Sequence, residues 1–246
     1  MSRIEAVALD PLPEVAAGDD LASLLLAAAG GDVGDGDVLV VAHKVVSKAE
    51  GAVVDLDSIE PGERALQLAA DQGKDARHIQ VVLDQSAEIM RAERGVLICR
   101  THHGFVCANA GVDASNAGRA ERLVTLPRDP DASARALRAV LPGRPAVVIS
   151  DSFGRAWRHG QVDVAVGVAG LAPLEDWRGR HDAWGRELHA TWIAIADQAA
   201  GAADLVRGKD SRVPAVRIRG LERFVTADDG PGAQALLRGR DEDLFT

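Results

Sequence analysis

Two valine-rich stretches in the middle of the chain constrain the fold most. Residues 144–150 (RPAVVIS) contain a continuous apolar run, and residues 161–170 (QVDVAVGVAG) alternate valine with smaller residues. A continuous run is typical of a buried strand, and a period of two is typical of a strand with one face in the core. We interpret the first strand as ending at Ser150-Asp151-Ser152, where polar side chains follow the apolar run. The glycines of the second stretch indicate close approach by a neighbouring backbone or a ligand.

Helices and further strands are predicted on both sides of these stretches. Helices are expected where apolar residues recur on one face, and strands where short apolar runs follow turn residues. No repeat, low-complexity segment or Pro/Gly/Ser-rich linker divides the chain. We therefore predict an α+β fold, with mixed sheets and packed helices, as one domain over residues 1–246 with room for two closely associated subdomains. The predicted helices are 61–73, 129–143 and 186–208, the last of them ending at Gly208; the predicted strands are 38–41 and 213–220, and a hairpin is expected over 95–112.

The composition is that of a globular protein and excludes two classes of partner. Hydrophobic residues make up 47% of the chain, charged residues make up 26%, and the net charge is -9. This acidity argues against nucleic-acid binding, and no apolar run approaches the roughly 18 residues that a membrane helix needs. The N-terminal residues lack the apolar core of a signal peptide, so we expect a cytoplasmic protein. In that compartment, Cys99 and Cys107 are expected to be reduced thiols.

Carboxylates and hydroxyls after two predicted strands form a candidate metal site. Asp113 and Asn116 lie in a polar loop (GVDASN), and Asp151 and Ser152 follow the strand over 144–150. Oxygen ligands of this kind suit Mg²⁺ or Mn²⁺, and loops at strand ends are where binding residues concentrate. The alternative is that Asp113 and Asp151 are turn residues or helix caps that bond to their own backbone.

Other site patterns are missing or ambiguous in this sequence. There is neither a GxxxxGK[ST] phosphate loop nor a GxGxxG motif after a predicted strand, and the histidines show no zinc spacing. Ser152 lacks the GxSxG context of a serine nucleophile. Lys44 and Lys48 are either phosphate ligands or solvated lysines. Arg155 and Arg158 either receive anionic groups or belong to a surface cluster around Trp157.

An ordered set of motifs carries a resemblance to a known family. LPEV, HKVVSKAEG, GVDASN, SDSFGRAWRHGQVDVAVGVAG, DWRGRHDAWGRELHAT and VPAVRIRG occur in this order between residues 12 and 220. Together they resemble the coenzyme F420:L-glutamate ligase family, and the resemblance is sharpest in SDSFGR and VAVGVAG.

The resemblance implies a GTP-dependent ligase that uses Mg²⁺ or Mn²⁺. Such an enzyme attaches L-glutamate to the deazaflavin precursor of coenzyme F420, joins further glutamates through γ-amide bonds, and releases GDP and phosphate. It also implies an intertwined homodimer with the site near the subunit interface, and a monovalent cation as a further cofactor. Some relatives carry a C-terminal nitroreductase-like domain, for which we expect no room in 246 residues.

The functional residues of the family match numbered positions of this chain. Asp113 and Asp151 match metal carboxylates and are the expected catalytic residues, while Ser152 matches a hydroxyl ligand. His43 stands where the family often has serine, and Lys209 stands where many members have a glutamine that helps to hold a second metal ion. The nucleotide-binding residues that the resemblance implies are Leu12, Pro13, Glu14, Val15, His43, Lys48, Asn116, Arg207, Gly208 and Lys209.

The expected chemistry is activation of a carboxylate by phosphorylation, followed by attack of the glutamate amine. Phosphoryl transfer depends mostly on positioning and on neutralisation of charge. From their charge alone, Arg155 and Arg158 are hypothesised to bind the anionic groups of the acceptor. Three alternatives stay open: a paralogue with another carboxylate acceptor, a non-catalytic protein that binds nucleotide and metal, and a metal-dependent phosphohydrolase.

Overall fold

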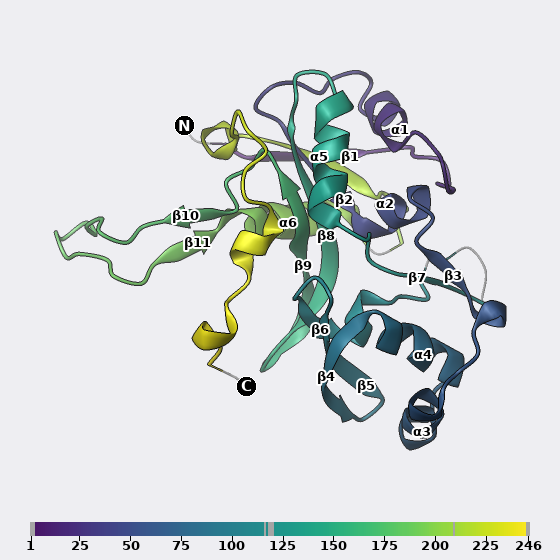
Figure 1. Ribbon diagram of the computed structural model, residues 1–246. Helices are drawn as coiled ribbons and strands as arrows, with labels where there is room; N and C mark the ends of the chain where they lie inside the picture. The colour runs from purple at the N-terminus through teal and green to yellow at the C-terminus, as the bar shows by residue number, and fades with distance from the viewer. Residues whose placement is uncertain (1–2, 116, 118–120, 209, 245–246) are drawn as a thin grey trace.

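A five-stranded mixed sheet forms the centre of the molecule (Figure 1). The computed structural model describes residues 3–115, 117, 121–208 and 210–244. The strand order is β1-β12-β2-β8-β9, and the β2–β8 pair is parallel whereas the other neighbours are antiparallel. The α+β prediction is therefore confirmed. The strands are β1 (Glu5–Leu9), β12 (Ala215–Arg219), β2 (Val38–Ala42), β8 (Ala146–Arg155) and β9 (Arg158–Ala169).

Valine-rich runs build the middle of this sheet. Residues 38–41 of β2 and 146–149 of β8 are completely buried, which explains their continuous apolar sequence. The prediction that β8 ends before Asp151 was wrong, because the strand continues to Arg155 against β9. A bulge between Ile149 and Ser150 marks the change from the buried half of β8 to its polar half.

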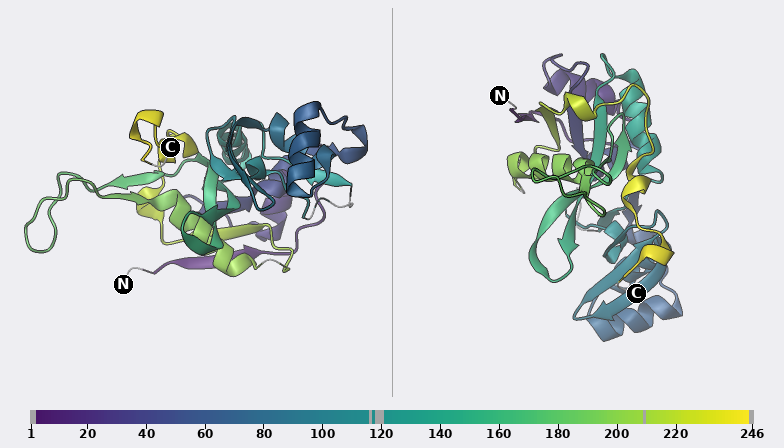
Figure 2. Two further views of the ribbon diagram at one scale, coloured as in Figure 1. Left: turned by 90° about the horizontal axis from the view of Figure 1, so that it is seen from below. Right: turned by 90° about the vertical axis from the view of Figure 1, so that its left-hand side faces the viewer.

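Two long helices cover opposite faces of the sheet (Figure 2). Helix α5 (Pro130–Val140) begins as its sequence predicts, since Asp129 caps the Ala132 amide and proline takes the first position. Helix α6 (Ile195–Arg207) ends at Gly208 as predicted, but it begins nine residues later than the predicted helix over 186–208. The residues before Ile195 instead pair as a strand or lie in an exposed loop. Two further helices are α1 (Leu21–Ala28) and α2 (His43–Ala49), which follows β2 directly.

A second lobe is inserted in the connection between β2 and β8. It has its own hydrophobic cluster, which includes Leu56, Ile79 and Leu123, and it contains a three-stranded sheet and two helices. The predicted hairpin is present as β5 paired with β6, and Cys99 faces Cys107 across it as a free, buried thiol. Burial raises the pKa of the Cys107 thiol to about 12. The elements of the lobe are β3 (Val53–Asp55), η1 (Leu56–Ser58), α3 (Glu63–Gln72), α4 (Ala76–Asp84), β4 (Ser86–Glu93), β5 (Val96–Thr101), β6 (Val106–Ala108), η2 (Asn109–Gly111) and β7 (Arg122–Val124).

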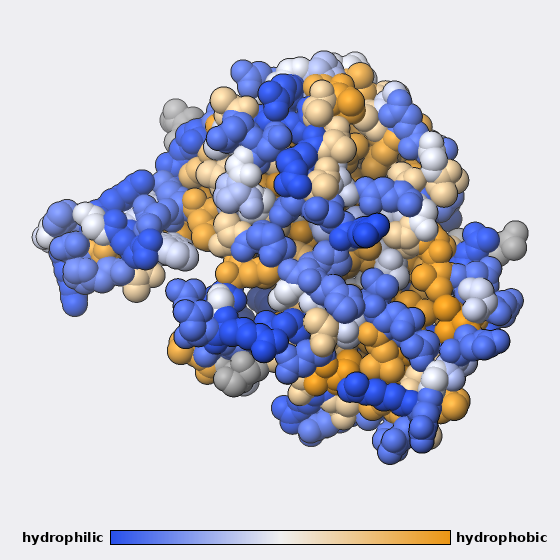
Figure 3. Space-filling view, viewed as in Figure 1, coloured by the Kyte–Doolittle hydropathy of each residue, from blue (hydrophilic) through white to orange (hydrophobic). Residues whose placement is uncertain are grey.

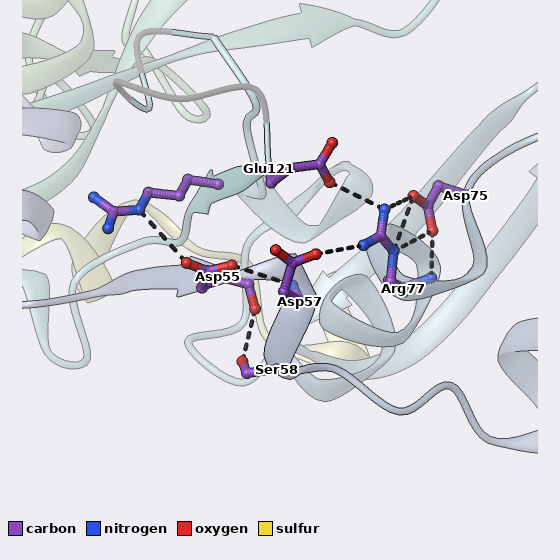
Figure 4. Close-up of polar contacts among 7 residues, drawn as sticks. Asp55, Asp57, Ser58, Asp75, Arg77 and Glu121 are labelled. Carbon is purple, nitrogen blue, oxygen red and sulfur yellow. Dashed lines mark hydrogen bonds and ion pairs between the residues drawn. The ribbon is translucent and has the colours of Figure 1, made fainter.

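A surface network of charges ties the elements of this lobe together (Figure 4). Arg77 at the start of α4 contacts Asp75, Asp57 and Glu121, which come from three separate segments. Because these groups are largely exposed, their contribution to stability is small, and the network mainly restricts how η1 and α4 sit against each other.

A two-stranded arm stands clear of the rest of the molecule (Figure 3). It consists of β10 (Leu174–Asp176) and β11 (Trp192–Ala194), joined by a long loop, and it pairs with no other strand. After β12, the described residues as far as 244 form three short 3-10 helices: η3 (Glu222–Phe224), η4 (Ala233–Leu236) and η5 (Arg240–Glu242). Within the described residues, no helix is long and apolar enough to cross a membrane.

At Gly167 the backbone of β9 lies close to the start of α5. A Cβ atom at Gly167 would lie 2.3 Å from the Pro130 carbonyl oxygen, so the backbones would have to separate. We expect Gly167→Ala to lower the free energy of unfolding by about 1–3 kcal/mol, as overpacking does elsewhere. Urea denaturation measures this. The control is Gly154→Ala on β8, where a Cβ would meet no atom within 4 Å. Equal stability of the two variants would contradict the close approach.

Candidate functional site

The unequal lengths of two neighbouring strands of the central sheet leave a cavity beside the longer one. β2 pairs with β8 only as far as Ala42 and Ser150, whereas β8 continues to Arg155. A cavity of about 920 Å³ is lined by residues from the end of β2, the polar half of β8 and the end of α6. The polar residues that interrupt the apolar run at Ser150 therefore line a cavity within a strand, and they do not form a turn.

This one cavity is lined by most of the residues that were predicted to form the site. They come from the N-terminal segment, α2, the loop at Asp113, β8 and the end of α6, which are far apart in the sequence. Asn116 and Lys209 lie outside the described residues. The predicted residues that line the cavity are Leu12, Pro13, Glu14, Val15, His43, Lys48, Asp113, Asp151, Ser152, Arg207 and Gly208.

Asp113 is held firmly at the edge of the cavity. Its backbone exchanges two hydrogen bonds with Val124, and its carboxylate accepts a 2.6 Å hydrogen bond from the Ser115 amide. The Lys44 ammonium lies 2.6 Å from the other carboxylate oxygen and also donates to the Ser115 hydroxyl at 2.7 Å. Burial alone would raise the pKa of Asp113, but the hydrogen bonds from Lys44 and Ser115 outweigh it and lower that pKa. Asp113 is thus held as a carboxylate.

Asp151 faces a buried histidine. His43 opens α2 and is 1% exposed, and its Nε2 lies 3.3 Å from a carboxylate oxygen of Asp151. Its Nδ1 lies 3.4 Å from the Ser47 hydroxyl, one turn further along the helix. His43 was predicted to contact a nucleotide; the structure places it against the carboxylate at the wall of the cavity.

The N-terminal segment is tied to α2 by an ion pair. Glu14 contacts the ammonium of Lys48, which is 8% exposed, and both residues line the cavity. Lys44 and Lys48 are four residues apart on α2, so they lie on the same face of this helix. The cavity therefore has two lysines on one wall and carboxylates on the facing segments.

A buried network that the sequence analysis missed lies beside Ser152. The Ser152 hydroxyl donates to Asp163 on β9 at 2.6 Å, and the Ser150 hydroxyl donates to the same carboxylate at 2.9 Å. Arg207 pairs with Asp163 and donates to Ser150 at 2.9 Å. The signal was present in QVDVAVGVAG, because Asp163 is a charged residue on the strand face that otherwise carries alanine and glycine. A buried acid requires a partner, and here the partner is 44 residues away in the sequence.

Arg155 and Arg158 lie away from the cavity. They pair across the exposed end of the β8–β9 hairpin, and Arg155 donates to the His159 carbonyl oxygen at 2.6 Å. Neither of them lines the cavity. Their predicted role in binding the acceptor stays a prediction.

The donor atoms on the cavity wall fit a metal ion that is bound partly by the protein and partly by phosphate and water. Within the described part of the chain, no group of three or more His, Cys, Asp or Glu side chains is arranged to hold a metal ion. Asp113, Asp151 and Ser152 offer two carboxylates and a hydroxyl, and Mg²⁺ often binds through one or two carboxylates together with water and substrate phosphates. These residues fit an ion that binds with a phosphate group, not an ion enclosed by protein ligands alone.

Lys44 controls the ionisation of Asp113, which leads to a testable prediction. We expect Lys44→Met to raise the pKa of Asp113, because burial persists while the strongest compensating hydrogen bond is lost. The lowered pKa stabilises the native fold above about pH 4, the range of the unfolded aspartate, and this stabilisation disappears as the pH falls through the folded value. In Lys44→Met this stabilisation should therefore be smaller, because the folded pKa no longer lies as far below the unfolded one. Carboxyl-carbon NMR titration measures the pKa, with Lys74→Met as the control. An unchanged pKa in Lys44→Met would contradict the pairing.

Comparisons with known proteins identify the family of this chain. Residues 11–220 match the family model described as F420-0:Gamma-glutamyl ligase. Among similar proteins, the coenzyme F420:L-glutamate ligase of Methanothermobacter thermautotrophicus is 45% identical, over 98% of both chains. The protein of the same name from Methanopyrus kandleri is 43% identical over the full length of both chains. The one from Archaeoglobus fulgidus is 40% identical, over 99% of this chain and 96% of the relative. The chain belongs to the F420-0:gamma-glutamyl ligase family.

Proposed function

We propose that this protein is a GTP- and divalent-metal-dependent ligase that joins L-glutamate to the coenzyme F420 precursor. Family membership over most of the chain, and relatives named coenzyme F420:L-glutamate ligase, support a glutamate-ligating role in the biosynthesis of this coenzyme. The observation that carries the proposal is the single cavity in which Asp113, Asp151 and Ser152 meet the basic residues of α2 and α6.

The first step that we propose is phosphorylation of the acceptor. A carboxylate oxygen of the acceptor attacks the γ-phosphorus of GTP, the bond between the β- and γ-phosphates breaks, and GDP leaves. An acyl phosphate is formed. Both reactants are anionic, so the cavity must neutralise charge and align them. Lys44, Lys48 and Arg207 supply positive charge on the cavity wall, and this role needs no proton transfer from them.

A divalent ion would be held by Asp113, Asp151 and the Ser152 hydroxyl together with the phosphates. When bound, Mg²⁺ or Mn²⁺ polarises the phosphoryl oxygens and offsets their charge. His43 contributes by fixing the orientation of the Asp151 carboxylate from its buried side.

The second step forms the amide bond. The glutamate amine attacks the acyl carbon, the carbon–oxygen bond to phosphate breaks, and inorganic phosphate leaves as the amine loses a proton. Exclusion of water matters here because an acyl phosphate is readily hydrolysed. We propose that Arg155 and Arg158 bind anionic groups of the acceptor at the outer end of the β8–β9 hairpin.

The reaction is tested by incubating the protein with GTP, Mn²⁺, L-glutamate and the glutamate-free coenzyme precursor. We expect GDP release that depends on glutamate, and a mass increase of the precursor by one or more glutamyl units. Asp113→Asn and Asp151→Asn should each lower turnover by about 10²-fold or more, because each replaces a carboxylate that would hold the divalent ion against the phosphates.

Three other outcomes would argue against this assignment. GDP release without glutamate would indicate a phosphohydrolase, and nucleotide binding without turnover would indicate a binding protein. Glutamate-dependent turnover only with another carboxylate would indicate a paralogue. Asp57→Asn, a surface carboxylate of the second lobe, serves as the matched control for the two variants of the site.

We further propose that the protein is a homodimer and that the arm contacts the second subunit. A hairpin of two short strands is marginal in water without a surface to pack against. Trp184 near the tip of the arm is 94% exposed, and large exposed apolar side chains on a projecting segment are typical of interaction sites.

Sedimentation tests this assembly. A dimer should have twice the 25.8 kDa mass of one chain, and Trp184→Ser should weaken association by about tenfold or more. Trp157→Ser, at the tip of the other exposed hairpin, is the matched control. A wild-type monomer at micromolar concentration, or equal association of the Trp184 variant, would contradict the proposal.

A further inference from the structure

Asp163 contacts two parts of the cavity wall, the polar half of β8 and the end of α6. It is 4% exposed, lies opposite Ser152 in the β8–β9 ladder, and has polar contacts with both of its oxygens. Oδ1 accepts from the Ser152 hydroxyl, and Oδ2 accepts from Ser150 and from the Arg207 guanidinium. The inference drawn from this arrangement rests on the proposed function, in which Ser152 and Arg207 face a metal ion and phosphate.

The contact with Ser152 determines what that hydroxyl can do. A serine hydroxyl has one proton and two lone pairs. The 2.6 Å hydrogen bond directs the proton to Asp163, so the oxygen can present only lone pairs to another group. A lone pair is what a cation requires, whereas a hydroxyl proton directed into the cavity would repel it. Asp163 therefore keeps Ser152 in the form of a ligand.

The contact with Arg207 fixes a second part of the wall. Arg207 is the last residue of α6, and the segment that follows it lines the cavity. Its Nη1 donates to the Pro214 carbonyl oxygen at 3.5 Å, and the Ala42 amide donates to that same oxygen at 2.8 Å. The guanidinium thus spans the segment from 208 to 214 and reaches the end of β2. The carboxylate of Asp163 provides the charge that keeps this buried cation in place.

We propose that Asp163 is a positioning residue that couples metal binding to nucleotide binding, acting through Ser152 and Arg207 and not by direct contact with the substrate. One carboxylate holds the hydroxyl ligand with one oxygen and the phosphate-side arginine with the other. Binding of the ion and binding of the nucleotide then depend on the same carboxylate.

The experiment measures binding of a fluorescent GTP analogue, mant-GTP, to the full chain with and without saturating Mn²⁺. The ratio of the two affinities is the coupling between metal and nucleotide. We expect Mn²⁺ to tighten mant-GTP binding in the wild type, and Asp163→Asn to reduce this gain by about tenfold. Asparagine has only one acceptor oxygen, and when that oxygen accepts from Arg207 the amide nitrogen faces Ser152 and cannot accept the serine proton. Ser152→Ala should lose a similar part of the gain. The variant that combines Asp163→Asn with Ser152→Ala should lose little more than either alone, since both substitutions act through one contact.

Asp131→Asn is the matched control. Asp131 is also a buried carboxylate bonded to β9, but it accepts the amides of Val168 and Ala233 outside the cavity. It should lower the melting temperature without changing the Mn²⁺-dependent gain. A merely structural role of Asp163 would weaken mant-GTP binding equally with and without Mn²⁺, and that result would overturn the proposal.

A second comparison avoids the unpaired buried arginine of Asp163→Asn, which threatens folding. Arg207→Gln and Asp163→Ala/Arg207→Gln differ only at position 163 and leave no buried cation without its carboxylate. Alanine has no side-chain acceptor for the Ser152 proton, whereas in Arg207→Gln the Asp163 carboxylate keeps it. The double variant should show the smaller gain, and equal gains would overturn the proposal. If wild-type protein shows no Mn²⁺-dependent gain, the proposed function fails together with this inference. If the wild type shows the gain and Asp163→Asn keeps it, only the role of Asp163 is wrong.

Discussion

The site depends on the early end of one strand. β2 ends opposite Ser150, so the second half of β8 has a strand partner only in β9. Had β2 continued, its backbone would occupy the edge at which Asp151 and Ser152 line the cavity. The chain instead turns into α2 at His43, which places His43, Lys44 and Lys48 beside that edge. The parallel pair thus provides a rigid, fully buried base, and the difference in strand length provides the opening.

The charges around the cavity are paired between separate elements. Asp113 with Lys44, Asp163 with Arg207 and Glu14 with Lys48 each join segments that are distant in sequence, and Asp151 faces the ring of His43. Exposed pairs of this kind contribute little to stability, whereas the buried pair of Asp163 and Arg207 is costly to break because it would leave a charge without compensation. In the proposed reaction, a cation and a polyphosphate would replace the partners of the more exposed groups, Asp113 and Lys44, while the buried pair of Asp163 and Arg207 stays together. Pairing of this kind compensates the charges on the cavity wall when no ligand is bound.

Much of the fold could be predicted from local pattern. The proline start and glycine end around α3, the capped start of α5, the hairpin over 95–112 and the alternating β9 all follow rules that act within a few residues. Two boundaries could not be predicted in this way. The polar half of β8 resembles a turn until β9 is seen to pair with it, and the residues before Ile195 resemble a helix until they are seen to form the arm. In both cases strand pairing with a distant or neighbouring segment overrode local propensity.

The sequence by itself determined which residue types are available for chemistry: hard oxygen ligands at Asp113, Asp151 and Ser152, lysines on α2, and motifs that resemble one ligase family. Only the tertiary structure decided that these groups share one cavity, that Lys44 keeps Asp113 ionised, and that Asp163 holds Ser152 and Arg207. The physical reason is that burial and charge pairing depend on distance in space. In the sequence, Asp163 is an isolated acid in a valine-rich strand. Its role can be recognised only in the structure, where α6 brings Arg207 into contact with it.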